Sequence, residues 1–275
     1  MTSIGRFLLS LYLWTVVGAV TVVVSSLILL SFPFALFDRA RRLAHGLGTV
    51  WARSLLKLNP LWDLRIDGRE YLQRGRGYVI VSNHASLADI VCLFTIGHQF
   101  KWLAKKSLFY VPFLGWAMSV MGYVPLERGR HGSIRKSYRE TLDWLRRDMS
   151  VLIFPEGTRS RTGEMGRFKS GAFRLAIESG RPVLPIVLAG TWGVLSKGKA
   201  GFGKPGAAYL VILPPVETTG WDLKDEEKLR EKVESLMRRE WVRRNQMLGR
   251  AVPRHPEGGQ RPTEGSQGSL APNPC

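Results

Sequence analysis

The sequence predicts an α/β domain, with a mixed central sheet flanked by helices, attached to an N-terminal membrane helix or helical hairpin. Two observations lead to this prediction. The 31 residues from Phe7 to Phe37 contain no charge, whereas a membrane span requires about 20 apolar residues. After this run, short apolar stretches alternate with longer stretches of helical period, which is typical of strands alternating with helices.

The charge-free run has three interpretations. It can cross the bilayer with some tilt, or Pro33 can divide it into a helix–turn–helix that enters one leaflet. A cleaved signal peptide would have an apolar core of about 7–15 residues, and this run is roughly twice as long, with no A-x-A-like site after it. Only Arg6 precedes the run, and the cations that follow it are Arg39, Arg41, Arg42, Arg53 and Lys57. Because Lys and Arg accumulate on the cytoplasmic side, we expect the remaining chain on the cytoplasmic face of the cell (inner) membrane.

Short apolar stretches predict the strands of the sheet. Each has the length of a buried strand, and Pro155 stops the third of them. The expected strands are Tyr78–Ser82, Phe100–Ala104, Val151–Phe154, Val183–Leu188 and Ala208–Leu213.

Helices are expected before, between and after these strands. The clearest is Ser133–Met149, where apolar residues recur at helical spacing, and Gly180 marks the end of another. The remaining expected helices are Ala40–Trp51 beside the membrane, Asp89–Gly97, Lys169–Ser179 and Lys224–Met247. Between the second and third strands, Lys105–Gly122 is an apolar and aromatic segment interrupted by Pro112.

Together these elements predict three parts. Residues 1–42 form the membrane anchor and juxtamembrane segment, and residues 43–249 form the cytoplasmic domain. The tail, residues 250–275, is rich in Pro, Gly, Ser and Gln from Val252 onward. Such a segment buries too little apolar surface to fold, so we expect it to be disordered.

The formal net charge of +18 indicates anionic partners, which are nucleic acid, anionic lipid or phosphorylated ligands. The tail holds three Arg and two Glu, so the basic character belongs to the folded part. Cys92 and Cys275 lie too far apart in sequence to suggest a disulfide framework. The five His and two Cys show no metal-ligand spacing, and we expect no metal.

The sequence excludes two motifs, the P-loop of nucleotide-binding proteins and the nucleophile elbow of α/β-hydrolases. The stretch from Gly198 to Lys204 has the glycine spacing of a P-loop, but Pro205 stands where Ser or Thr is required. Lys197–Lys204 is better explained as a flexible basic loop. The chain has no G-x-S-x-G, so the nucleophile elbow of α/β-hydrolases is absent.

His84 and Asp89 are the candidate catalytic pair. They lie where a strand ends and a helix begins, a position at the rim of an α/β sheet where ligands bind. With a turn between them, the carboxylate can return to the imidazole, fix its tautomer and leave the other nitrogen free to accept a proton. This is the base half of a catalytic triad without a nucleophile. A helix N-cap beside an incidental histidine would give the same pattern.

Anion-binding residues are expected in two other places. After the third strand, Gly157 lets backbone amides approach an anion and Arg159 can bind phosphate with two hydrogen bonds. Alternatively this segment is a polar turn with Arg159 paired to a surface acid. Lys105 and Arg128 could neutralise a phosphate monoester, although isolated cations are usually solvated at the surface.

Two sequence blocks resemble the glycerolipid acyltransferase family, in particular its 1-acylglycerol-3-phosphate acyltransferases. Residues 83–89 match the first block, N-H-x-x-x-x-D, and residues 154–160 match the third, F-P-E-G-T-R-S, at every position. The spacing from Lys105 through Leu108 and Gly115 to Arg128 is similar to the pattern of members that use lysophosphatidate.

The two other blocks of that family are matched more loosely. Residues 122–128 resemble the second block, with Leu126-Glu127 where Ile-Asp is usual. Residues 183–187 resemble the fourth, V-P-I-x-P, with Leu184 and Leu188 where Pro is common. The resemblance covers roughly residues 64–213, in the right order and spacing.

The resemblance implies an α/β domain with an acyl tunnel and an O-acyl transfer reaction. His84 would deprotonate the free hydroxyl of 1-acyl-sn-glycerol 3-phosphate while Asp89 orients the ring, and the oxygen would attack the thioester of acyl-CoA or acyl carrier protein. The residues that would bind the acceptor are Lys105, Arg128, Glu156, Gly157, Thr158 and Arg159. The product would be phosphatidic acid, with no permanently bound cofactor. The expected partners are lysophosphatidic acid, the acyl donor and an anionic membrane surface, but not nucleic acid.

Three other functions remain open at this point. The first is acylation of a different lyso-lipid, such as a lyso-aminolipid or another lysophospholipid. A thioester hydrolase would differ only in using water in place of the lipid hydroxyl. A non-enzymatic membrane protein that binds anionic lipid or nucleic acid would explain the charge and the anchor, but not the His84–Asp89 pair.

Overall fold

The computed structural model describes residues 3–59, 62–195, 198, 201–203 and 206–250 of the chain. Its centre is a seven-stranded sheet in the order β1-β7-β6-β2-β5-β3-β4. The strands are β1 Trp62–Asp67, β2 Val79–Ser82, β3 Phe100–Lys105, β4 Val124–Leu126, β5 Ser150–Ile153, β6 Val183–Ala189 and β7 Gly206–Ile212. Neighbouring strands are parallel except β6 and β7, which are antiparallel, so the sheet is mixed, as predicted.

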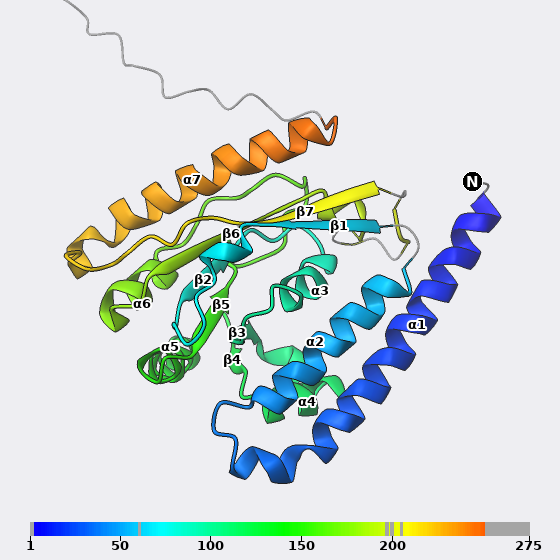
Figure 1. Ribbon diagram of the computed structural model, residues 1–275, viewed down its shortest axis with the longest axis horizontal. Coiled ribbons are helices and arrows are strands. Elements are labelled where there is room, and N and C mark those ends of the chain that lie inside the picture. The colour runs from blue at the N-terminus through cyan, green and yellow to red at the C-terminus, as the bar shows by residue number, and fades with distance from the viewer. Residues whose placement is uncertain (1–2, 60–61, 196–197, 199–200, 204–205, 251–275) are drawn as a thin grey trace, which may run out of the picture.

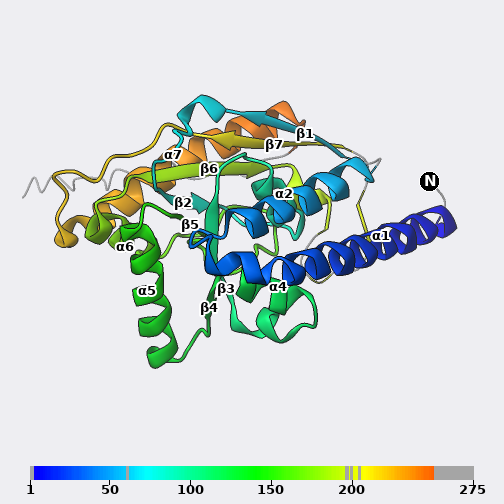
Figure 2. The same ribbon diagram turned by 60° about the horizontal axis from the view of Figure 1, so that its bottom comes forward.

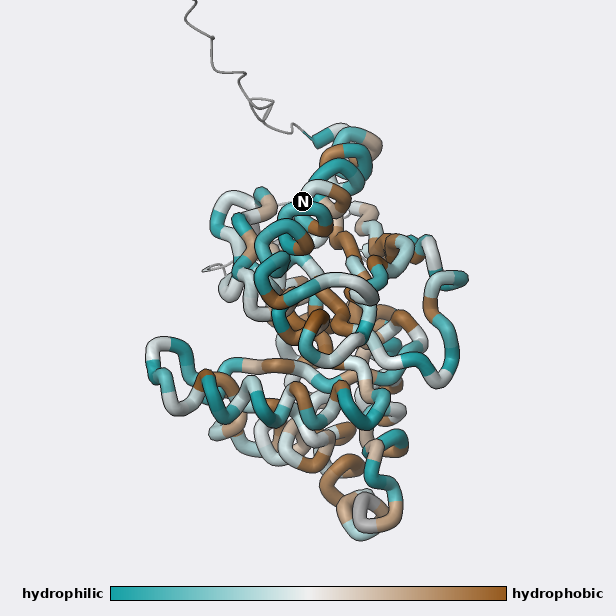
Figure 3. The backbone as a smooth tube through the Cα atoms, turned by 90° about the vertical axis from the view of Figure 1, so that its left-hand side faces the viewer, coloured by the Kyte–Doolittle hydropathy of each residue, from teal (hydrophilic) through white to brown (hydrophobic). Residues whose placement is uncertain are grey.

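Helices cover both faces of this sheet (Figure 1). They are α1 Ser3–Leu30, α2 Arg42–Lys57, α3 Ala88–Phe94, α4 Leu114–Val120, α5 His131–Arg146, α6 Gly171–Ser179 and α7 Glu226–Met247. One hydrophobic core joins α1–α4 to the sheet, and a second joins α5–α7 to the other face. Strand β2 contributes to both, because Ile80 faces the first core and Val79 and Val81 face the second, as the two-residue period of a strand requires. The hydrophobic strands therefore lie between two helical layers (Figure 3).

All five predicted strands are present, and two further strands were missed. In β1, Trp62, Leu64 and Ile66 alternate with charged residues, and the burial of the strand alternates accordingly. This two-residue period was visible in the sequence. The other missed strand, β4, has only three residues and contains Pro125, which leaves too short a pattern to recognise.

The N-terminal segment forms a helical hairpin. A 3-10 turn, Phe32–Leu36, follows α1 and contains Pro33, and α2 then packs back against α1 (Figures 1 and 2). The Trp51 indole N–H donates to the Thr21 hydroxyl across the pair at 3.0 Å. In length and composition, Phe7–Leu30 could cross a membrane. The second helix of the hairpin ends at Lys57.

The buried Lys101 fastens this hairpin to the sheet. Its ammonium donates to the carbonyl oxygens of Ala40, between α1 and α2, at 2.8 Å and of Met121, after α4, at 2.7 Å. Burial and, to a smaller extent, the nearby Arg41 together lower the pKa of Lys101 to about 7. A cation inside the core is thus held by two backbone carbonyls rather than by a carboxylate.

Two predicted loops extend beyond what the structure describes. The expected disordered tail, apart from Arg250, lies outside the described residues, as do parts of the expected basic loop Lys197–Lys204.

Candidate active site

The parallel strands bring the predicted site residues to one edge of the sheet. Strands β2, β5, β3 and β4 are neighbours and run in the same direction, so their carboxyl ends meet. His84 follows β2, Gly157 follows β5, Lys105 ends β3 and Arg128 follows β4. His84 and Glu156, which are 72 positions apart in sequence, are therefore close together at this edge.

Asn83 fixes the segment that carries the candidate catalytic pair, His84 and Asp89. Its side-chain amide donates to the carbonyl of Leu188 and its side-chain oxygen accepts from the Leu188 N–H, both at 2.8 Å. The Asn83 side chain thus continues the pairing between β2 and β6 beyond the end of β2. This explains the asparagine of the N-H-x-x-x-x-D block, to which the sequence alone assigned no function.

The Asp89 carboxylate orients His84. Asp89 lies in the first turn of α3 and is fully buried. Its Oδ2 accepts hydrogen bonds from His84 Nδ1 at 2.8 Å and from the N–H groups of Ala85 at 2.7 Å and Ser86 at 2.8 Å. The Nδ1–H tautomer that this contact favours leaves Nε2 unprotonated and able to accept a proton.

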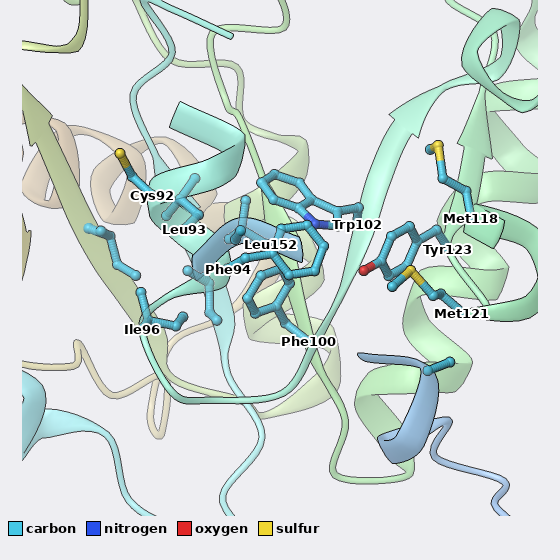
Figure 4. Packing of buried hydrophobic residues seen from close by; sticks show 14 of the residues in the cluster. Cys92, Leu93, Phe94, Ile96, Phe100, Trp102, Met118, Met121, Tyr123 and Leu152 are labelled. Carbon is cyan, nitrogen blue, oxygen red and sulfur yellow. The ribbon is translucent and has the colours of Figure 1, made fainter. Parts of the chain in front are cut away.

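An aromatic column supports the other side of the imidazole. The Phe154 ring stacks on His84 with centroids 3.9 Å apart. The ring centroids of Trp102 and Phe154 are 5.4 Å apart, and those of Phe94 and Trp102 are 6.0 Å apart. Figure 4 shows Trp102 and Phe94 packed beside Phe100 in the core. The imidazole is therefore held at Nδ1 by a buried carboxylate and on one face by an aromatic ring.

In the structure, Glu156 lies between two loops. Its carboxylate accepts the backbone N–H of His84 at 2.8 Å and that of Gly166 at 3.0 Å. Burial raises the pKa of Glu156 to about 7, although these two hydrogen bonds oppose the shift. Glu156 therefore braces two loops against each other, and its expected part in acceptor binding stays a prediction.

The predicted cations line one large cavity with the histidine. The cavity has a volume of about 1420 Å³, and His84, Lys105, Arg128 and Arg159 all contribute to its wall. Gly157 and Thr158 line it too. Most of the remaining wall is apolar, and α1, α2, α3 and α4 each contribute to it. This volume exceeds the roughly 300–1,000 Å³ of ordinary ligand sites, so an acyl chain could be accommodated beside a polar headgroup.

Lys169 is a cation of the site that the sequence analysis missed. Its N–H donates to the carbonyl of Pro155 at 2.9 Å, and its side chain crosses Gly157. A Cβ added to Gly157, which has φ +74°, would lie 3.2 Å from both Cε and Nζ of Lys169. Lys169 lines the same cavity as Arg159. The sequence signal was a lysine at the predicted start of a helix, which is common and not specific.

The structure also explains two further residues of the family resemblance, Gly115 and Glu127. A Cβ on Gly115 would lie 2.2 Å from the carbonyl oxygen of Phe109, so only glycine allows α4 to pack there. Glu127, which replaces the usual Asp, pairs with Lys106 at 3.0 Å and Arg130 at 3.4 Å.

Comparison with known proteins identifies the domain. The family model named Acyltransferase matches residues 63–189, a range that contains every site residue described above. Residues 63–189 form an acyltransferase-family domain. The crystal structure of the 1-acyl-sn-glycerophosphate (LPA) acyltransferase PlsC from Thermotoga maritima superposes with a TM-score of 0.78 at 27% identity, covering 89% of this chain and 98% of that one. The glycerolipid-acyltransferase-like fold is thereby confirmed.

Several curated relatives of this acyltransferase domain carry one name. A chloroplastic 1-acyl-sn-glycerol-3-phosphate acyltransferase of Brassica napus is 36% identical over 80% of this chain. One of Arabidopsis thaliana, also chloroplastic, is 37% identical over 72%, and the human alpha form is 32% identical over 66%. The matches span 64%, 56% and 66% of the lengths of these three relatives.

Proposed function

We propose that this protein transfers an acyl chain from acyl-CoA or acyl carrier protein to the free hydroxyl of 1-acyl-sn-glycerol 3-phosphate, giving phosphatidic acid in phospholipid synthesis. The observation that carries the proposal is the His84–Asp89 hydrogen bond of 2.8 Å at the wall of a cavity that also holds Lys105, Arg128 and Arg159. The names of the relatives support the same acceptor.

In the proposed reaction, His84 Nε2 removes the proton of the acceptor hydroxyl as its oxygen attacks the thioester carbonyl. Asp89 stabilises the imidazolium that forms. The tetrahedral intermediate collapses, the carbon–sulfur bond breaks, and the imidazolium returns its proton to the departing thiolate. Every proton and electron pair is accounted for by the acceptor, the thioester and the imidazole.

The cations hold the acceptor in place. Arg159, Lys105, Arg128 and Lys169 would surround the phosphate monoester, whose two negative charges need several donors in a partly apolar cavity. Fixing the phosphate sets the distance between the free hydroxyl and Nε2, which converts a diffusional encounter into a positioned one. Thr158 and Gly157 would contribute to the same wall.

We further propose that α1 holds the enzyme on the cytoplasmic side of the inner membrane. Its span Phe7–Leu30 is apolar enough to enter a bilayer, and both the acceptor and the product are membrane lipids. The basic surface would then face anionic headgroups, each near-surface cation contributing about 1 kcal/mol.

An acceptor panel tests the proposal. Membranes that contain the overproduced protein are supplied with labelled acyl-CoA or acyl carrier protein and with lysophosphatidate, other lysophospholipids or a lyso-aminolipid. We expect phosphatidic acid from lysophosphatidate, and no product with the His84→Ala variant, which remains in the membrane. Turnover confined to another acceptor would replace lysophosphatidate in the proposal. Free fatty acid without any lipid product would indicate a hydrolase.

A further inference from the structure

The segment between β3 and α4 exposes large apolar side chains to the outside of the protein. It comprises a 3-10 turn, Lys106–Tyr110, and the start of α4. Tyr110 has 71% of its surface exposed and Trp116 51%. The other exposed apolar residues of the segment are Leu108, Val111 and Phe113. Five such residues within nine positions are unusual for a surface that meets only water.

The backbone of this segment is held in a strained form. Phe113 has φ +61°, a conformation that a bulky residue adopts at a cost of about 1–3 kcal/mol. The Gly115 N–H donates to the carbonyl of Val111 at 2.7 Å, and Gly115 packs directly on Phe109. The aromatic rings of Phe113 and Trp116 also contact each other, with centroids 5.5 Å apart. The exposed side chains therefore stand on a fixed support rather than on a loosely packed loop.

The exposed segment continues the apolar surface of α1. Helix α4 packs against α1, and Figure 2 shows α4 and its preceding turn beside α1. Residues of α1 such as Phe7, Leu11 and Val23 are exposed in the same way. Lys105 and Lys106 lie at the start of the segment, so cations border the apolar side chains as they do at a membrane interface.

The segment also borders the cavity that contains His84. Leu108, Val111 and Phe113 are both exposed and part of the cavity wall. On α1, Trp14 and Val22 share these two properties. The apolar surface of the molecule and the apolar interior of the cavity are thus continuous at the boundary between α1 and this segment.

We propose that residues 108–116 form a second membrane-inserting element beside α1, which enters an anionic lipid leaflet as far as the interface between headgroups and acyl chains. Tyr110 and Trp116 are the residue types that favour the interface between headgroups and acyl chains. Insertion at this place puts the mouth of the cavity in contact with the lipid, so that an apolar ligand reaches the cavity without crossing water.

The test measures insertion directly and requires no enzymatic turnover, so it can fail while the proposed reaction stands. In a chain with Cys275→Ser, in which Cys92 is buried, a Tyr110→Cys variant is labelled with an environment-sensitive nitrobenzoxadiazole dye. Trp116→Cys provides a second labelling site. The matched control is Ser235→Cys, which is exposed on α7, the helix that packs on the opposite face of the sheet.

The labelled proteins are mixed with vesicles of phosphatidylcholine and phosphatidylglycerol, with and without spin-labelled lipid. We expect a several-fold rise in emission for the probes at positions 110 and 116, quenching by the spin label, and neither effect at position 235. Emission at 110 and 116 that matches the control would overturn the proposal. A rise that depends on protein concentration without vesicles would also overturn it, because a second copy of the chain would then cover the segment.

Discussion

The ring of Phe154 lies flat against the imidazole of His84, with centroids 3.9 Å apart and planes inclined by 9°. Phe154 directly follows β5 and His84 follows β2, so the contact depends on the parallel pairing of these two strands. Together with the hydrogen bond to Asp89, the stack leaves the imidazole one orientation.

Shortening this aromatic wall should impair catalysis without removing the base. We expect Phe154→Leu to lower kcat about 10-fold with little change in the KM for the acceptor, because the imidazole gains freedom to rotate away from the hydroxyl. Steady-state kinetics on lysophosphatidate check this expectation. An unchanged kcat would show that Asp89 alone is enough to hold the ring.

Replacing Glu156 distinguishes a brace from a phosphate ligand. Glu156→Gln keeps the size of the side chain but turns one acceptor oxygen into a donor, so one of the backbone N–H groups of His84 and Gly166 loses its partner. We expect kcat to fall roughly 10-fold while the KM for the acceptor stays the same. A change confined to KM would instead return Glu156 to the acceptor site.

The same carboxyl group should make stability depend on pH. Its pKa in the fold, about 7, is above the ordinary value of 4.5, so the neutral form is favoured by folding. The contribution to stability is therefore complete below pH 4.5 and is lost as the pH rises through about 7. Denaturant unfolding at pH 5 and pH 8 should show the wild type losing stability relative to Glu156→Gln. Parallel curves for the two proteins would contradict the assignment.

Lys169 should matter for acceptor binding. We expect Lys169→Met to raise the KM for lysophosphatidate about 10-fold, the effect of one charge-assisted hydrogen bond to phosphate. Gly157→Ala should act in the same direction, because its new Cβ would lie 3.2 Å from Lys169 Nζ and alanine is strained at φ +74°. The control is Arg161→Met, an exposed cation of the following loop that is not part of the cavity wall. Equal effects of the lysine and arginine changes would indicate only a general loss of charge.

Lys101 should produce a pH effect of opposite sign in a different range. Its pKa is lowered from 10.5 to about 7 in the fold, so between these values the unfolded chain binds a proton that the folded chain does not. The free energy of unfolding should therefore rise with pH over this range, by at most about 1.4 kcal/mol per pH unit. Lys101→Met should abolish this rise, whereas Lys57→Met, an exposed lysine at the end of α2, should retain it. Unfolding in detergent at pH 7 and pH 9 provides the comparison.

Local patterns in the sequence determined much of this protein. Short continuous apolar stretches predicted five strands, because a strand covered on both faces is apolar throughout, and the helical period of the apolar residues predicted most helices. The five-residue spacing predicted the contact between His84 and Asp89, since a turn at the start of α3 needs only local geometry. The sequence blocks also indicated the family, and the match of the Acyltransferase family model to residues 63–189 confirms it.

The tertiary structure alone decided how distant residues meet. Glu156 contacts the backbone of a residue 72 positions away, and this partner depends on β2 and β5 being neighbours, which no local pattern specifies. The packing of Lys169 over Gly157 and of α2 against α1 likewise depends on which elements are neighbours in the fold. A periodic pattern records which side of an element is buried, whereas the packing of whole elements determines what that side touches.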